Sequence, residues 1–158
     1  MKAAGAALVL AGGWVVWRQY TRTLRREVAL LEDFAAALTL LAGEIRWRLL
    51  PLPEGIRQLE ERKLTGSYFR RVVESLTGGN TLQESWGSAF SDIPWEWAAL
   101  LCRMEWTGDA QQLQRSLLWI ARQLDERRSA AREELHQREK LCAAVSASGA
   151  GLVILILM

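Results

Sequence analysis

The segment "VALLEDFAAALTLLAGEIRWRL" (Val28–Leu49) carries the longest apolar stripe of the sequence. Its apolar residues recur at alternating steps of three and four, which places them on one face of a long helix. We expect this helix to stop before Pro51, because proline disfavours helical geometry in the preceding residue and cannot donate a backbone hydrogen bond. The stripe consists of Val28, Leu31, Ala35, Leu38, Ala42, Ile45 and Leu49, widened by Phe34 and Leu41.

Start and stop signals downstream of this helix predict five shorter helices. Proline suits the first turn of a helix, and glycine commonly ends one. Serine, threonine and aspartate before the first turn accept hydrogen bonds from free backbone amides. The signals are Pro53 and Gly66 for the second helix, Ser67 and "TGGN" (Thr77–Asn80) for the third, Thr81, Glu84 and "SDIP" (Ser91–Pro94) for the fourth, Pro94 and Gly108 for the fifth, and Asp109 for the sixth.

The sixth predicted helix changes character along its length. Its first half carries an apolar stripe with Trp119 and Ala121 at the edges. From Asp125 to Lys140 ten of sixteen residues are charged, which is typical of a solvated extension of the same helix. A coiled-coil surface is the alternative for this extension, with Ala131 and Leu135 as its apolar seam positions. The stripe of the first half consists of Leu113, Leu117, Ile120 and Leu124.

Composition limits both the fold class and the function. Residues that favour helices dominate, and no stretch of alternating β-branched residues is long enough for a strand. We therefore predict an all-α protein, an antiparallel helical bundle of about six helices. Lys and Arg (20) nearly balance Asp and Glu (18), and a net charge of +2 does not favour nucleic-acid binding. Cys102 and Cys142 have neither the number nor the spacing of a disulfide framework or a metal site.

Both ends of the sequence are apolar. Ala3–Trp17 is an uncharged run between Lys2 and Arg18, and Leu141–Met158 is a second run. As helices they reach about 22 and 27 Å, and interfacial anchoring would let them cross a hydrocarbon layer of roughly 30 Å. We therefore predict an N-terminal and a C-terminal membrane helix flanking the bundle. A secretory signal peptide is the alternative for the first run, and a buried core helix is the alternative for the second.

Basic residues flank both apolar runs on the side of the bundle, whereas Lys2 alone lies on the other side. Because positive charge favours the cytoplasmic side of a membrane, we expect the bundle to face the cytoplasm. The predicted organisation is an N-terminal membrane anchor over 1–20, a cytoplasmic helical bundle over 21–126, a charged helical stalk over 127–140 and a C-terminal membrane helix over 141–158. The flanking basic residues are Arg18, Arg22, Arg25, Arg26, Arg132, Arg138 and Lys140.

The sequence gives little indication of catalytic chemistry. His136, the only histidine, lies in the charged extension, where no apolar pocket would shift its pKa. Cys102 lies on a predicted core face and Cys142 in the predicted C-terminal span, so neither has a base beside it. We therefore predict a protein that is not an enzyme and uses no cofactor or metal. An enzyme acting at the membrane surface is the alternative, and it would need a nucleophile or a metal cluster.

Two tryptophans indicate a partner interface. Trp47 lies between Arg46 and Arg48, and Trp95 lies beside Glu96, so neither is easily placed in a core. Exposed aromatic residues near arginine are common at protein interfaces. We therefore take Trp47 and Trp95 as the candidate partner interface. A half-buried position at the rim of the core is the alternative for both.

Six features of the sequence are characteristic in combination: "RQYTRTLRR", "EIRWRLLPLPEGI", "LTGGNTLQESW", "MEWTGDAQQLQ", the charged helix and the two apolar ends. Through them the chain resembles, over nearly its whole length, the stage III sporulation protein AB family, whose members are membrane proteins of endospore-forming bacteria. Through "PLPEGI" and "GGNTLQESW" the bundle is also similar to the cytoplasmic domain of the type II secretion F family.

The resemblance implies a platform in the channel between mother cell and forespore, located in the mother-cell membrane. It implies a secretion-type ATPase of the same complex as the partner that docks on the bundle, together with other membrane channel components and membrane lipid. The F family usually carries two copies of the domain and three spans, whereas one copy and two short spans are predicted here. The alternative is a membrane-tethered helical regulator or scaffold that self-associates as a homo-oligomer, without a channel role.

Overall fold

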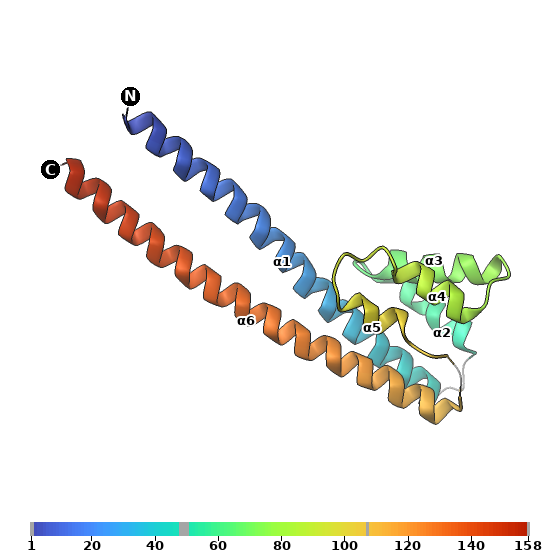
Figure 1. Ribbon diagram of the computed structural model, residues 1–158. Helices are drawn as coiled ribbons and strands as arrows, with labels where there is room; N and C mark the ends of the chain where they lie inside the picture. Colours follow the sequence, from blue (N-terminus) through green and yellow to red (C-terminus); the bar gives the residue numbers. More distant parts are fainter. Residues whose placement is uncertain (1, 48–50, 107, 158) are drawn as a thin grey trace. The chain divides into compact units, whose positions relative to one another are not determined.

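The computed structural model describes the backbone of residues 2–47, 51–106 and 108–157, and the side chains of residues 12, 14–15, 17–45, 51–106 and 108–142. The regular secondary structure in these ranges is helical throughout, which confirms the predicted all-α class (Figure 1). The elements are α1 (Lys2–Trp47), α2 (Leu52–Gln58), the 3-10 turn η1 (Leu59–Glu61), α3 (Gly66–Thr77), α4 (Leu82–Phe90), α5 (Ala98–Cys102) and α6 (Ala110–Leu157).

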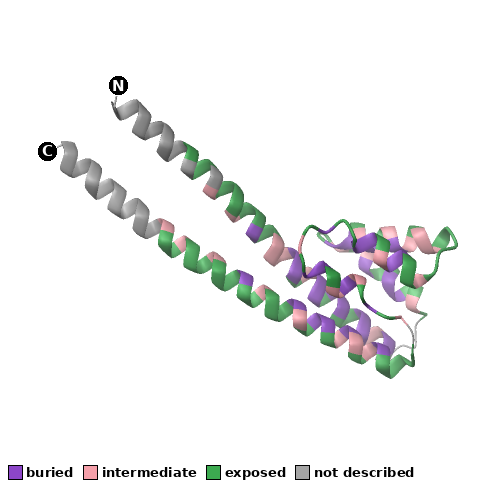
Figure 2. Ribbon diagram, viewed as in Figure 1, coloured by how far each residue is buried: buried purple, intermediate pink, exposed green. Residues whose placement is uncertain are grey.

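The chain divides into two compact units. We call Ala29–Arg128 the bundle, and Met1–Val28 with Ser129–Met158 the terminal pair. Helices α1 and α6 contribute to both units. Buried residues concentrate in the bundle, whereas exposed positions dominate the described part of the terminal pair (Figure 2).

The two predicted membrane helices are not separate elements, since each apolar run continues a longer helix, α1 or α6. Among the residues that the structure describes, no helix combines the length and the apolar content that a membrane crossing needs.

The core of the bundle is built around α1. Phe34 is fully buried, and its ring lies 5.5 Å from those of Tyr68 and Phe90 and 5.9 Å from that of Trp97. Aromatic pairs of this kind contribute about 0.5–1.5 kcal/mol each beyond the burial of their area. The predicted stripe is confirmed over most of its length, while Leu49 lies outside the described residues. Its buried members are Leu31, Phe34, Ala35, Leu38, Leu41, Ala42 and Ile45.

Helix α4 is hydrogen-bonded to α5 and to the segment that follows it. The indole nitrogen of Trp86 donates to the carbonyl oxygen of Leu101 at 3.0 Å. The side-chain amide of Gln83 binds two backbone groups after α5. Its nitrogen donates to the Met104 carbonyl at 2.9 Å, and its oxygen accepts from the Trp106 backbone N–H at 3.3 Å. Residues of "LTGGNTLQESW" and "MEWTGDAQQLQ" therefore meet here, with Trp86 and Met104 buried and Gln83 exposed.

Two cap predictions are confirmed. Thr81 and Glu84 form a reciprocal capping box at the start of α4, with side chain and backbone bonded in both directions. Asp109 accepts a hydrogen bond of 2.6 Å from the backbone of Gln112 at the start of α6. Each cap satisfies amides that the first turn of a helix leaves without partners.

The predicted fifth helix, Pro94–Glu105, is wrong in extent, because α5 covers only Ala98–Cys102. The residues before it form turns, with Ala98 donating to the carbonyl of Trp95 at 3.0 Å. After it, the Gln83 amide takes the backbone groups that would continue the helix. Gly108 therefore does not end that helix; its φ of +121° makes the turn into α6.

The predicted boundary at Gly66 and Ser67 is also wrong. Gly66 begins α3 rather than ending the preceding helix, and the residue before the helix is Thr65 rather than Ser67. A Cβ atom at position 66 would collide with the carbonyl oxygen of Glu60. Glycine is therefore required here for the close approach of two backbone segments.

Candidate partner-binding surface

The structure gives different outcomes for the two tryptophans of the predicted interface. Trp95 is half-buried and stacks on Trp97, with ring centroids 5.8 Å apart and planes at 11°. Trp97 belongs to the core. Trp47 is the last residue of α1, and its side chain lies outside the described residues. Trp95 thus lies at the edge of the core, with one face of its indole ring against Trp97.

A larger apolar surface lies between α1 and α6 of the bundle. An open groove there has small side chains in its floor, among them Ala35, Ala36 and Ala121. Leu40 lines the groove and is 45% exposed. Trp119, which the sequence places at the edge of the α6 stripe, is 56% exposed and lies outside the groove lining. Large apolar side chains left in solvent are typical of interaction surfaces.

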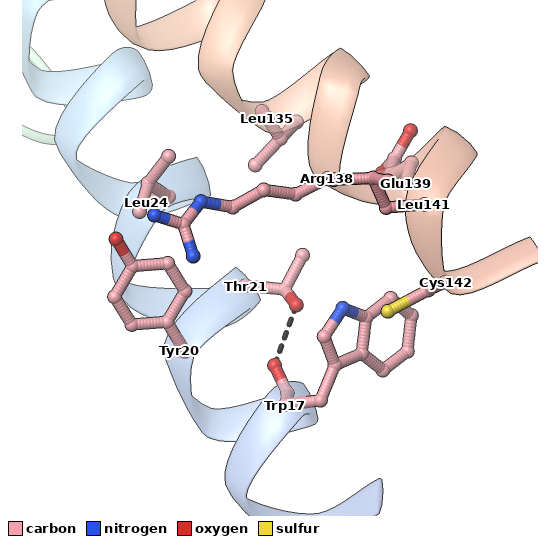
Figure 3. Close-up of a pocket in the computed structure, with 9 residues that line it drawn as sticks. All are labelled: Trp17, Tyr20, Thr21, Leu24, Leu135, Arg138, Glu139, Leu141 and Cys142. Atoms are coloured by element: carbon pink, nitrogen blue, oxygen red, sulfur yellow. Dashed lines mark hydrogen bonds between the residues drawn. The ribbon is translucent and has the colours of Figure 1, made fainter. Parts of the chain in front are cut away.

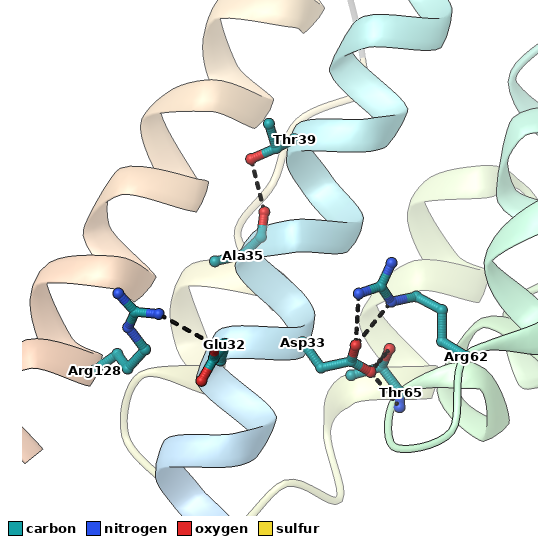
Figure 4. Close-up of polar contacts among 7 residues, drawn as sticks. All are labelled: Glu32, Asp33, Ala35, Thr39, Arg62, Thr65 and Arg128. Carbon is teal, nitrogen blue, oxygen red and sulfur yellow. Dashed lines mark hydrogen bonds and ion pairs between the residues drawn. The ribbon is translucent and has the colours of Figure 1, made fainter. Parts of the chain in front are cut away.

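The charges around this groove are unevenly paired. Arg128 donates to Asp125 at 2.8 Å and lies 3.6 Å from Glu32, so one arginine faces two carboxylates. Figure 4 shows the Arg128 side chain reaching Glu32. Arg122 also lines the groove, and it has no acidic partner among the described residues. Arg115, one turn before Trp119, lies outside the groove lining and bonds to the backbone of its own helix at 3.4 Å. The groove therefore carries charges of both signs, two arginines and two acids, beside its apolar lining.

Asp33 follows Glu32 directly, but its side chain leaves α1 on another side and points to Arg62 and Thr65 (Figure 4). Its carboxylate accepts bonds of 2.9 and 2.6 Å from Arg62 and of 3.1 and 2.8 Å from the backbone and hydroxyl of Thr65. Burial pushes the pKa of Asp33 upward, but the bonds from Arg62 and Thr65 and the Arg62 charge outweigh it and lower the pKa below its ordinary value. The cluster ties the segment between η1 and α3 to α1.

The side chains with possible chemistry do not gather. Within the described part of the chain, no three His, Cys, Asp or Glu residues are placed to hold a metal ion. Burial raises the pKa of Cys102, whose thiol points to the Gly87 carbonyl at 3.8 Å. His136 is exposed on α6. What the described surface offers is shape, apolar area and charges of both signs.

Sequence reasoning missed the groove because it searched for apolar stripes and for isolated tryptophans. A signal was present nevertheless. Arg115, Trp119 and Arg122 are spaced four and three residues apart, so they share a helix face on which none of the buried stripe lies. Leu40 lies beside the α1 stripe and not in it. Only the packing of α1 against α6 shows that the two faces border one groove.

Comparison with known proteins identifies the family and nothing finer. Neither the curated proteins nor the solved structures give a match. The family model of stage III sporulation protein AB matches residues 2–158. This match spans almost the entire sequence and includes both segments whose residues meet between α4 and the residues after α5. The chain therefore belongs to the stage III sporulation protein AB family, and its role lies in sporulation.

Proposed function

We propose that the protein is a non-catalytic platform of the channel between mother cell and forespore. Its two apolar ends anchor it in the mother-cell membrane, its bundle faces the cytoplasm, and the bundle couples a secretion-type ATPase to the membrane complex. The observation that carries this proposal is the groove between α1 and α6, in a chain that belongs to a sporulation family.

The groove supports docking through its composition. Exposed Trp and Arg are the residue types that contribute most often to binding energy at protein interfaces. Leu40 and Leu118 line the groove and give apolar contact, and Arg122 gives a charge without an acidic partner among the described residues. The exposed Trp119 and Arg115 share the helix face of Arg122 and extend this surface outside the groove lining. Such a surface fits a helix that carries an apolar stripe flanked by acidic residues. The ATPase is expected to present such a helix.

The terminal pair supports membrane attachment. Trp14 and Val15 are each 56% exposed, Tyr20 is 43% exposed and Leu141 is 65% exposed. They adjoin the apolar runs of the sequence, and basic residues surround them. Trp and Tyr beside Arg are typical of the headgroup layer of a membrane. Cysteines introduced at Lys2 and Met158 should react with an impermeant thiol reagent only from outside the mother-cell cytoplasm.

Docking can be tested with the full chain in detergent and the purified ATPase, by measuring the dissociation constant. Leu40→Ala and Arg122→Glu, both at residues that line the groove, should each weaken binding at least about tenfold, which corresponds to about 1.4 kcal/mol. Leu64→Ala is the matched apolar control, because Leu64 is 47% exposed away from the groove. Arg57→Glu is the charge control, because Arg57 is an exposed residue of α2 outside the groove lining.

Equal losses in the groove variants and the controls would contradict docking in the groove. Absence of any binding by the full chain would remove the coupling role. In that case the mass of the detergent-solubilised chain tests the self-associating scaffold. A dimer that Trp119→Ala dissociates would favour that function.

A further inference from the structure

A second cavity lies within the terminal pair, between α1 and α6 (Figure 3). It encloses about 180 Å³, and most of its lining is apolar. The hydroxyl of Thr21 donates its hydrogen to the carbonyl of Trp17 at 2.6 Å, so this donor is not available to a ligand. The residues used in the argument below are Trp17, Tyr20, Leu24, Leu135, Arg138 and Cys142.

One cation reaches into this apolar space. The Arg138 side chain extends from α6 towards α1, and its guanidinium lies 4.7 Å from the centre of the Tyr20 ring. Its Nε and Nη2 donate to one oxygen of Glu134, at 3.2 and 2.9 Å. A guanidinium has five N–H donors, so Nη1 and the second hydrogen of Nη2 remain without a partner among the described residues. These donors point to an anion with several acceptor oxygens.

The surroundings of the cavity match the boundary of a membrane. Leu141, at one edge, is 65% exposed and starts the C-terminal apolar run. Glu139 also lines the cavity, and its carboxylate is paired with Arg25 at 2.8 Å. Elsewhere on the same two helix segments Arg22, Arg26 and Lys140 have no acidic partner among the described residues. An apolar cavity within basic helix segments is an arrangement that suits an anionic lipid headgroup.

We propose that this cavity binds one anionic phospholipid. The phosphate accepts hydrogen bonds from the free donors of Arg138, and an acyl chain lies against Trp17, Leu24 and Cys142. Tyr20 holds the guanidinium in place through its ring. The inference rests on the proposed membrane attachment. It adds that the terminal pair binds one class of lipid, an anionic phospholipid. It concerns a site separate from the groove of the bundle.

Native mass spectrometry of the full chain in nonionic detergent tests the site. Dioleoyl phosphatidylglycerol should be retained at one molecule per chain, in clear preference to dioleoyl phosphatidylcholine with the same acyl chains. Arg138→Gln should reduce retention about tenfold, and Arg138→Lys should give an intermediate loss because it keeps the charge without the planar fork. Arg22→Gln is the matched control and should change retention less than twofold.

Cys142→Phe tests the same cavity without touching the cation, because it fills the apolar end, and it should also reduce retention. Equal retention of the two lipids, or equal losses in Arg138→Gln and Arg22→Gln, would overturn the proposal. Displacement of the phosphatidylglycerol by inorganic phosphate or glycerol phosphate would show a phosphate site and would likewise overturn a lipid site. Persistence of the lipid under both competitors supports it.

Flotation with vesicles separates this inference from the proposed attachment. A chain that floats equally with pure phosphatidylcholine vesicles and with vesicles containing phosphatidylglycerol, and retains neither lipid in detergent, keeps its anchors but lacks the lipid site. A chain that floats with neither vesicle loses both the attachment and the site.

Discussion

The bundle and the terminal pair share two helices but bury apolar side chains to very different extents. In the bundle, α1 is buried on most of its circumference, and the Phe34 ring contacts four other aromatic rings. In the described part of the terminal pair, the buried residues are only Leu24 and Ala131. Because apolar burial is the dominant favourable term in folding, it stabilises the bundle far more than the described part of the terminal pair.

One ion pair from each unit shows the same contrast in burial, although the two pairs have similar N···O distances. Asp33 and Arg62 are 2.6 Å apart, with side chains 18% and 24% exposed. Arg25 and Glu139 are 2.8 Å apart, with side chains 65% and 38% exposed. Water screens the second pair far more than the first. Distance alone therefore does not rank these pairs; the burial of the charges does.

Replacing a core tryptophan should have the largest effect. Trp86→Ala should lower the free energy of unfolding by about 3–5 kcal/mol, because it opens a cavity and removes one of the two hydrogen bonds to the Leu101 carbonyl. Trp119→Ala is the control and should change it by less than about 0.5 kcal/mol. Urea unfolding of the full chain at constant detergent, followed by circular dichroism, measures both. Similar losses would contradict the contrast between core and surface.

Removing the charge of Asp33 should come next. Asp33→Asn should cost about 2 kcal/mol, since it leaves Arg62 half-buried without its counter-ion and weakens the bonds from Thr65. The same urea titration measures this cost. A double-mutant cycle with Arg62→Gln isolates the pair itself. A coupling energy near zero would show that the pair contributes no more than an exposed one.

The contribution of Asp33 should also depend on pH. Its pKa is lower in the folded chain than the ordinary value of 3.8, so the folded state favours the ionised form. The stabilisation is therefore fully present above about pH 4 and is lost as the pH falls through the folded-state pKa. The difference in unfolding free energy between the natural chain and Asp33→Asn should be constant above about pH 4 and should shrink as the pH falls below it. A difference that stays constant on further acidification would contradict the assignment.

The smallest effect is expected for the exposed pair. Glu139→Gln should change the free energy of unfolding by less than about 0.5 kcal/mol, because both partners are largely in water. Raising the salt concentration should remove even that difference. A loss comparable to that of Asp33→Asn would mean that the terminal pair is more tightly packed than its exposed side chains indicate.

Much of the fold follows from local patterns. The α1 stripe, the capping box at Thr81 and Glu84 and the break at "TGGN" all depend on neighbours within one or two turns, and the structure confirms them. The errors occur where distant residues intervene. The Gln83 side chain stops α5, and the backbone at Glu60 requires a glycine at position 66. No local propensity contains either interaction.

The candidate site was less predictable than the fold. Trp95 was identified from the sequence and is half-buried against Trp97. The groove brings residues of α1 and α6 together, although Leu40 and Leu118 are far apart in the chain. Whether an apolar residue is buried or left at a surface depends on what packs over it. That information is not present in the periodicity of one helix.

The sequence by itself determined the all-α class, the positions of most helices and the family, because these depend on the spacing of apolar residues, on local caps and on motifs along the chain. Only the tertiary structure decided which of two adjacent acids is half-buried, which tryptophan is exposed and where cations lack partners. The physical reason is that burial and charge pairing are set by contacts between residues distant in the chain, and these contacts form only when the helices pack.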